Sequence, residues 1–161
     1  MTLKKMAATV LVILTASGLW ACWRQGGQTV LRIYDYETKK IYVEYPVQAG
    51  DKLTFGWIHS WERIPWQEYY HIAPDHSLVL DTITFPAFGA GIPENKGKKV
   101  RIEKGLIYME EIGQVFPQFD WLNSPFTREI KVNGQLLTSG WILPEHRRLL
   151  LVVERRGLFK P

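Results

Sequence analysis

From residue 29 onward, apolar residues recur at every second position in short runs, and no long stretch repeats them at every third and fourth position. Alternation places one face of a strand against a core and the other in water, which is typical of β-structure. Gly, Pro, Asn and Asp separate the runs and favour turns. The expected strands are 29–34, 40–45, 52–59, 66–72, 77–85, 100–103, 106–110, 126–132, 135–138 and 148–154. About ten short strands predict an all-β fold, an antiparallel sandwich or a partly open barrel.

Two local features refine this prediction. Asn133-Gly134 lies between two alternating runs, and both residue types tolerate the positive φ angles of a two-residue hairpin turn, so we expect a tight hairpin there. Residues 111–125 show neither period and contain Gly113 and Pro117. We expect a loop, with room for a helical turn, that is packed by its own aromatic residues.

The N-terminal segment has a different pattern. Residues 6–23 carry no charge, follow Lys4 and Lys5, and precede Arg24. This is the pattern of a secretory signal, and the apolar stretch is also just long enough to remain as a membrane anchor. We therefore expect an apolar leader helix over 1–23, a short linker over 24–28 and a single β-domain over 29–161. Both interpretations place the domain outside the cytoplasm, secreted or tethered to the membrane.

Cys22 ends the leader and is the only cysteine, which excludes an intrachain disulfide. The run Leu19-Trp20-Ala21-Cys22 resembles a bacterial lipobox, in which the cysteine thiol receives diacylglycerol. Trp20 departs from the small residue usual at that position. Cys22 is therefore a candidate for lipidation, and the alternative is an apolar residue inside an uncleaved anchor.

Composition and charge exclude several classes of function. The 161 residues are 46% hydrophobic and 13% aromatic, which suffices for one core. The net charge is +4, and without residues 1–21 Lys plus Arg falls from 20 to 18 against 16 acids, a net of +2. That charge is too small to indicate nucleic acid. No Walker loop, HExxH, Gly-x-Ser-x-Gly or paired cysteines occur, so no cofactor is predicted.

The stretch 57–71 concentrates polar residues among aromatic ones. In the expected strand 52–59, His59 ends an apolar row, and in the strand 66–72, Glu68 interrupts one. Both side chains should therefore lie on the inward face. A carboxylate among aromatic residues is costly to bury without a partner.

The register of this hairpin decides which groups meet. We expect Phe55 to lie opposite Tyr70, which places Trp57 opposite Glu68. His59 is then a diagonal neighbour of Glu68, within reach of its side chain.

A polar cluster at one end of the sheet follows from this register. It combines His59 and Glu68 with Glu62 and Arg63 of the connecting loop. The alternative is an ion-pair network with a purely structural role. Metal binding by His59, Glu68 and Asp81 matches no ligand spacing, so no metal is predicted.

A hydrolytic use of Ser60 would require a bend in the strand, because His59 and Ser60 point to opposite faces. The neighbouring Trp61 is the tryptophan that we expect to be most exposed, as recognition surfaces often have.

The second candidate site is the glycine-rich segment 85–93. Its small residues free backbone amides to approach a ligand or another chain, and rigid prolines close both ends. The residues concerned are Phe88, Gly89, Ala90 and Gly91. The alternative is a tight crossover between two sheets.

These motifs together resemble the domain-of-unknown-function family 1850. The matching stretches are Gly50-Asp51-Lys52-Leu53, Ile58-His59-Ser60-Trp61-Glu62-Arg63, the acid Glu68 and Phe88-Gly89-Ala90-Gly91-Ile92-Pro93, behind an apolar leader. Trp61 replaces the family's usual small aliphatic residue, and Ala87 replaces a serine. Members of the family are typically encoded beside TRAP transporters of the TAXI type and have no established activity.

The resemblance implies an exported accessory of solute uptake that binds the TRAP permease, the TAXI solute-binding protein or a small acidic solute. The expected contact residues are His59, Ser60, Glu62, Arg63, Glu68, Phe88, Gly89, Ala90 and Gly91. One alternative is a hydrolase or metal-dependent enzyme in which Glu68 orients His59 as general base. Another is a structural envelope protein in which the polar cluster only fixes the hairpin.

Overall fold

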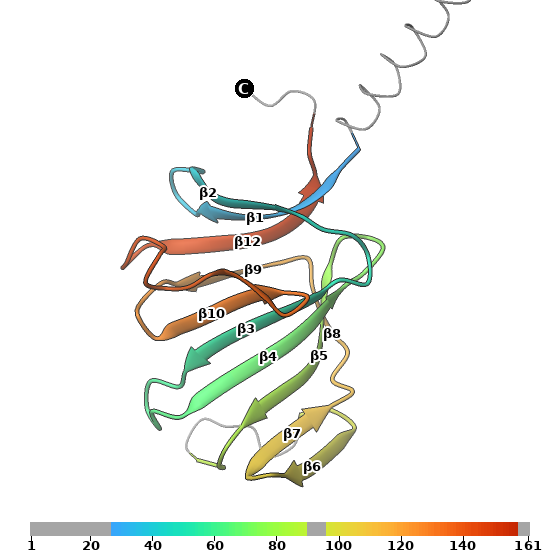
Figure 1. Ribbon diagram of the computed structural model, residues 1–161, viewed down its shortest axis with the longest axis vertical. Coiled ribbons are helices and arrows are strands. Elements are labelled where there is room, and N and C mark those ends of the chain that lie inside the picture. The colour runs from blue at the N-terminus through green and yellow to red at the C-terminus, as the bar shows by residue number, and fades with distance from the viewer. Residues whose placement is uncertain (1–26, 90–95, 158–161) are drawn as a thin grey trace, which may run out of the picture. The chain divides into compact units, whose positions relative to one another are not determined.

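The computed structural model describes residues 27–89 and 96–157, which form 12 strands in two antiparallel sheets and no helix (Figure 1). The predicted all-β class is confirmed. The sheets do not close into a barrel, so the sandwich is the alternative that holds. Within the described residues, no helix has the length and apolar character needed to cross a membrane. The leader, Cys22 and the linker as far as residue 26 lie outside the described residues.

Residues Val30–Glu154 form the compact unit that carries both sheets. The described residues just outside it, 27–29 and 155–157, group into a separate unit. Within that second unit, the amide of Arg156 donates a hydrogen bond to the carbonyl of Gln28 at 2.8 Å.

The smaller sheet, sheet A, has four strands in the order β2-β1-β12-β9. Their bounds are β1 Thr29–Asp35, β2 Ile41–Pro46, β9 Gln118–Leu122 and β12 Arg148–Arg155. The first and last parts of the domain therefore pair directly in β1 and β12. β9 is an edge strand bonded to β12, with Leu149 opposite Trp121.

The larger sheet, sheet B, follows the order β11-β10-β3-β4-β5-β7-β6, and β8 pairs with the other end of β5. Its strands are β3 Lys52–Ile58, β4 Pro65–Ile72, β5 Leu78–Phe85, β6 Lys99–Glu103, β7 Leu106–Glu110, β8 Gln114–Phe116, β10 Thr127–Val132 and β11 Gln135–Thr138. Figure 1 shows β3, β4 and β5 running side by side as the centre of this sheet.

One hydrophobic core joins the two sheets. Sheet A contributes Leu31, Ile33, Leu149 and Leu151, and sheet B contributes Leu53, Ile72, Leu78, Leu80, Ile83, Phe85, Ile130 and Val132. Many of these residues occupy alternate positions of their strands, and consecutive buried residues occur at 149–151 in β12 and 83–85 in β5. The alternation in the sequence therefore encodes which face of each strand is buried.

The predicted hairpin of β3 and β4 forms, but its predicted register is wrong by two residues. Phe55 lies opposite Glu68, and Trp57 lies opposite Trp66. The inward face of each strand is unchanged, because a shift of two residues preserves side-chain parity. The connecting turn is tighter than expected: the amide of His59 donates to the carbonyl of Ile64 at 2.9 Å.

The segment 111–125 contains two strands, β8 and β9, where a loop was expected. Pro117 and Gly113 interrupt the segment so closely that neither strand exceeds five residues. Within β9, Phe119 and Trp121 are half-buried while their neighbours are exposed. The alternation of apolar and polar residues in the sequence is too short to predict a strand so close to Gly113 and Pro117, which both disfavour regular structure.

The predicted hairpin at Asn133-Gly134 is confirmed. Both residues have positive φ, 50° and 80°, and they join β10 to β11. Asn133 also accepts a hydrogen bond from the amide of Lys52 at 2.9 Å through its side-chain oxygen, which ties the turn to the start of β3.

Candidate functional site

A cavity of about 450 Å³ is lined by strands of both sheets. Most of its lining is aromatic or aliphatic, and the polar groups are few. Its residues are Phe55, Trp57, Ile58, Ser60, Glu68, Tyr70, Leu80, Lys96, Phe116, Phe119, Asp120, Trp121, Leu122, Ser124, Phe126 and Thr127. An apolar cavity with a few convergent polar groups is the usual form of a small-molecule site.

Four aromatic rings form a continuous wall where the two sheets meet. The ring centroid of Phe55 in β3 lies 5.2 Å from that of Phe119 and 5.3 Å from that of Trp121, both edge-on. Tyr70 in β4 stacks on Phe119 at 5.8 Å. Such pairs fix the orientation of large rings and hold β9 against sheet B.

Glu68 brings the carboxylate of this cavity. It is half-buried in β4, and its oxygens accept hydrogen bonds from Trp66 Nε1 at 3.1 Å and from Tyr70 Oη at 2.6 Å. Tyr70 is only 3% exposed, and burial together with the Glu68 carboxylate raises the pKa of its phenol far above the usual value. The phenol therefore stays protonated and remains a donor to Glu68.

Several exposed residues line the mouth of the cavity, and two of them are large and apolar. Leu122 and Phe126 line the cavity and expose 67% and 51% of their surface. Between them Asn123 is fully buried, and its side-chain amide donates to the carbonyls of Gly140, Leu143 and Pro144.

The loop 139–143 lies beside this mouth because Gly140 is packed tightly against it. A Cβ atom at Gly140 would lie 2.1 Å from the carbonyl oxygen of Ser124 and 2.7 Å from that of Thr127. Trp141 and Ile142, the next two residues of the loop, are 70% and 71% exposed. The mouth therefore lies next to further exposed apolar surface.

The predicted cluster around His59 and Glu68 is not formed as a single network. The Trp57–Trp66 pair lies between the two residues in the register, and His59 packs its ring on these tryptophans at 5.5 and 6.0 Å between centroids. Its Nδ1 accepts the amide of Glu62 at 3.4 Å. His59 and Glu68 therefore have different partners, and the structure does not bring Arg63 to Glu68.

The structure does bring the connecting loop to the glycine-rich segment. A Cβ atom at Gly89 would lie 2.6 Å from Cδ of Glu62, so only glycine lets this carboxylate lie against the backbone. Phe88 packs edge-on against Phe85 with 5.7 Å between centroids, and Phe85 stacks on Trp66 at 4.9 Å. Two predicted sites are thus adjacent, although Ala90 and Gly91 lie outside the described residues.

The remaining predicted residues of the loop face solvent. Trp61 is 78% exposed, as expected. Arg63 is exposed and has a positive φ of 56°. Ser60 is exposed as well, but it lines the cavity. Among the predicted site residues that the structure describes, Ser60 and Glu68 border the cavity.

Asp81 has a partner other than the one considered for a metal site. One of its oxygens lies 2.8 Å from Nδ1 of His71 and 3.8 Å from Nζ of Lys52. No three His, Cys, Asp or Glu side chains in the described part of the chain are arranged to hold a metal ion.

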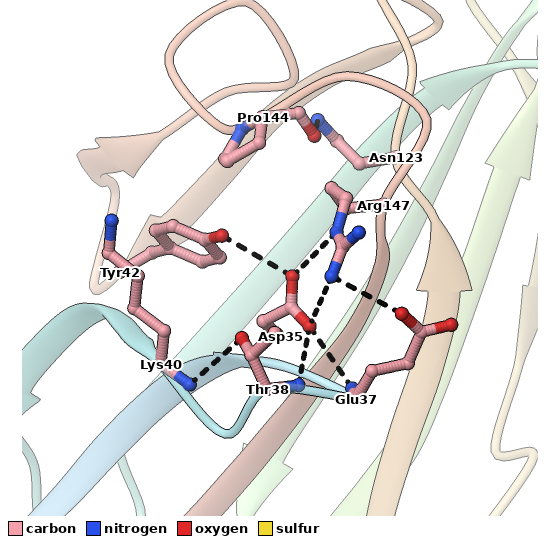
Figure 2. A network of polar contacts seen from close by, with 8 residues as sticks. All are labelled: Asp35, Glu37, Thr38, Lys40, Tyr42, Asn123, Pro144 and Arg147. Carbon is pink, nitrogen blue, oxygen red and sulfur yellow. Dashed lines mark hydrogen bonds and ion pairs between the residues drawn. The ribbon is translucent and has the colours of Figure 1, made fainter.

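A second polar network lies at the β1–β2 turn, and Figure 2 shows it in detail. Asp35 is 1% exposed and accepts two hydrogen bonds from the Arg147 guanidinium, at 2.7 and 2.9 Å. The amides of Glu37 and Thr38 and the hydroxyl of Tyr42 also donate to it. Arg147 holds the pKa of Asp35 well below its usual range. Donors occupy both carboxylate oxygens of Asp35, so the carboxylate offers no open position for a ligand, and we interpret the network as structural.

The cavity residues from 116 to 127 were missed by sequence reasoning. The sequence pattern predicts a loop packed by its own aromatics around Phe116, Phe119 and Trp121. The alternation of Gln118, Phe119, Asp120 and Trp121 is the signal that predicts one inward face. It does not indicate that β9 joins the other sheet, which only the three-dimensional pairing decides.

Comparison with known proteins places the chain in a family. Residues 53–137 match the model of the domain of unknown function DUF1850. The chain belongs to this family. The match covers more than half of the chain and includes every residue that lines the cavity. Searches of curated proteins and of solved structures found no match.

Proposed function

We propose that this DUF1850 chain is a solute-binding accessory domain, exported and held at or released from the membrane, that assists a TAXI-type TRAP uptake system. The cavity between the sheets is the solute site. The exposed loop 60–63 and the adjacent Phe88 are the surface for the permease or the TAXI solute-binding protein. The function is binding and does not include catalysis.

The cavity is the observation that carries this proposal. Its volume of about 450 Å³ falls within the range of small-molecule sites, and its aromatic walls come from strands that are fixed by cross-strand pairing. Leu122 and Phe126 add exposed apolar surface to its lining. A purely structural core would bring Phe55, Phe119 and Trp121 together without leaving such a space.

The docking surface is supported by its composition. Trp61 is largely exposed and Arg63 lies two residues further on, and these residue types dominate binding energy at protein interfaces. The contact of Glu62 with Gly89 joins this loop to the segment that contains Phe88, which is itself 50% exposed. The uptake role itself is inferred from the resemblance to exported proteins encoded beside such transporters.

A hydrolase with His59 as general base has less support. Glu68 would have to orient the imidazole, but its oxygens bind Trp66 and Tyr70. The Nδ1 atom of His59 accepts the amide of Glu62 instead. The geometry therefore favours binding over acid–base catalysis.

The solute site is tested with the neutral fluorescent probe N-phenyl-1-naphthylamine. We expect saturable binding of one probe per chain, and we expect Ser60→Trp to weaken it by about tenfold because the larger side chain would fill the cavity from an exposed lining position. Leu136→Trp is the matched control, since Leu136 is 55% exposed and does not line the cavity. Equal affinity in the two variants, or absence of saturable binding of both this neutral probe and charged probes of similar size, would contradict a solute site.

The docking surface is tested by uptake in a strain that carries the chain with a TAXI-type transporter. Arg63→Ala should abolish uptake while the amount of folded chain is unchanged, because Arg63 is exposed and its removal disturbs no core contact. Arg128→Ala, which removes an exposed arginine from β10, is the control and should leave uptake intact. Normal uptake with Arg63→Ala would count against docking through this loop.

A further inference from the structure

Glu68 differs from Glu44, Glu110 and Glu129, three other half-buried glutamates, in the partners of its carboxylate. Glu44, Glu110 and Glu129 each lie within 3 Å of an arginine or lysine nitrogen. Within residues 27–89 and 96–157, the partners of Glu68 are two neutral donors, Trp66 and Tyr70, and no ion pair. Its negative charge therefore has no cationic counterpart in this part of the chain.

The residues near the cavity do not change this balance. Lys96 lines the cavity but forms no ion pair with Glu68 in the part of the chain that the structure describes. The segment 90–95 contains no lysine, arginine or histidine. Asp120, the other acid of the lining, is paired with Arg148, whose Nε lies 2.7 Å from it. The hydrogen bonds from Trp66 and Tyr70 stabilise the Glu68 carboxylate in part, and a positive group in the cavity would stabilise it further.

The rings around Glu68 are suited to a positive group. Tryptophan, tyrosine and phenylalanine rings attract cations through their negative faces. Phe55 lies directly opposite Glu68 in the β3–β4 register. Tyr70, Phe119 and Trp121 line the same cavity within 6 Å of a neighbouring ring. Aromatic walls beside one carboxylate are the arrangement that binds ammonium groups.

We propose that the solute of this cavity is an organic cation, with its ammonium group against Glu68 and its apolar part among the rings of Phe55, Phe119 and Trp121. This inference rests on the solute site proposed above and specifies the chemistry of its ligand. A cationic solute replaces the acidic solute that Arg63 led us to expect. Arg63 is exposed on the loop, whereas the carboxylate of Glu68 lines the cavity.

Three probes of similar shape separate the chemistries. Benzyltrimethylammonium carries the positive charge, neopentylbenzene is its uncharged carbon analogue, and phenylacetate carries a negative charge. Binding of each to the purified full-length chain is measured by isothermal titration calorimetry. We expect the cation to bind about tenfold more tightly than the neutral analogue, as a carboxylate and aromatic faces together provide. Phenylacetate should bind more weakly than either.

Two variants assign the preference to one side chain. Glu68→Gln keeps an oxygen that accepts a hydrogen bond from Trp66 or Tyr70 but removes the negative charge. It should therefore reduce the affinity for the cation about tenfold and leave the affinity for neopentylbenzene unchanged. Asp120→Asn is the matched control, because its charge is already paired with Arg148, and it should change the cation's affinity less than threefold, about the size of a surface ion-pair effect.

The outcomes distinguish the inference from the proposed function. If none of the three probes and no N-phenyl-1-naphthylamine bind, the solute site itself is refuted. If the neutral probe or phenylacetate binds as tightly as the cation, the cavity is a solute site and the cationic ligand is refuted. The comparison of probes on the unmodified chain decides this even if Glu68→Gln fails to fold, which its thermal melting curve would show.

Discussion

Asp35 shows how a single residue is held in its charged form within this fold. Its side chain is almost fully buried, and Arg147, Tyr42 and two backbone amides all donate to it. Each donor favours the carboxylate over the neutral acid, and the Arg147 guanidinium contributes most to the lowered pKa. The residue thereby joins the turn after β1 to the segment that leads into β12.

The lowered pKa of Asp35 predicts a pH dependence of stability. Because the folded-state pKa lies below the unfolded value of about 4, the ion pair stabilises fully above that pH and is lost as the pH falls through the folded-state pKa. Asp35→Asn should lower the melting temperature at pH 7 by several degrees and flatten its decline in acid. Thermal melts from pH 7 to pH 2 measure both effects.

Glu37→Gln is the control for this experiment. Its carboxylate is 3.3 Å from Arg147 but its side chain is 73% exposed, so solvent screens the pair. Its melting curve should follow that of the unmodified chain at every pH. An equally steep acid decline in Asp35→Asn would show that other carboxylates govern acid unfolding.

Among the elements, the β10–β11 hairpin depends directly on its turn sequence. Gly134 has a φ of 80°, and a Cβ atom there would meet no other atom within 4 Å, so only backbone strain opposes a larger residue. Gly134→Val should reduce the free energy of unfolding by about 1–2 kcal/mol. Urea denaturation measures this difference.

Leu136→Val serves as the comparison for the hairpin. Leu136 is exposed in β11, where a β-branched residue is acceptable, so the change should be within about 0.5 kcal/mol. If Gly134→Val were equally neutral, the positive φ of the turn would not constrain the hairpin.

The strands show how far the sequence predicts this fold. Long alternating runs such as Lys52–Ile58 and Leu78–Phe85 are predicted to within about a residue, because one buried face imposes the period. Short strands such as Gln118–Leu122 are not predicted, because nearby prolines and glycines obscure an alternation of only five residues. The predicted β3–β4 register differs from the observed one by two residues, because the parity of side chains allows every even shift.

The candidate site was predictable only in part for the same reason. Glu68 was recognised because a carboxylate interrupts an apolar row within its own strand. Its neighbours across the cavity, Phe119 and Trp121, belong to the other sheet, and sequence patterns do not encode which sheet a strand joins. Its assigned partner His59 followed from the displaced register.

At the scale of the whole molecule, the two sheets share one core. Leu53 in sheet B and Leu151 in sheet A are both fully buried in the same cluster. Leu53→Ala and Leu151→Ala should each lower the free energy of unfolding by about 2–5 kcal/mol and leave a single unfolding transition. Calorimetry would reveal two transitions if the sheets unfolded independently. Leu122→Ala, at a mostly exposed position, is the control and should cost much less.

Because β9 lies at the edge of sheet A, solute binding in the cavity would change how firmly this strand is held. Among the strands of residues 27–89 and 96–157, β9 is hydrogen-bonded only to β12, and its aromatic side chains contact β3 and β4. A solute bound among those rings would add contacts between β9 and sheet B. The solute-bound and solute-free forms would then differ in how readily β9 separates from sheet B. A partner protein would be able to distinguish the two forms by that difference.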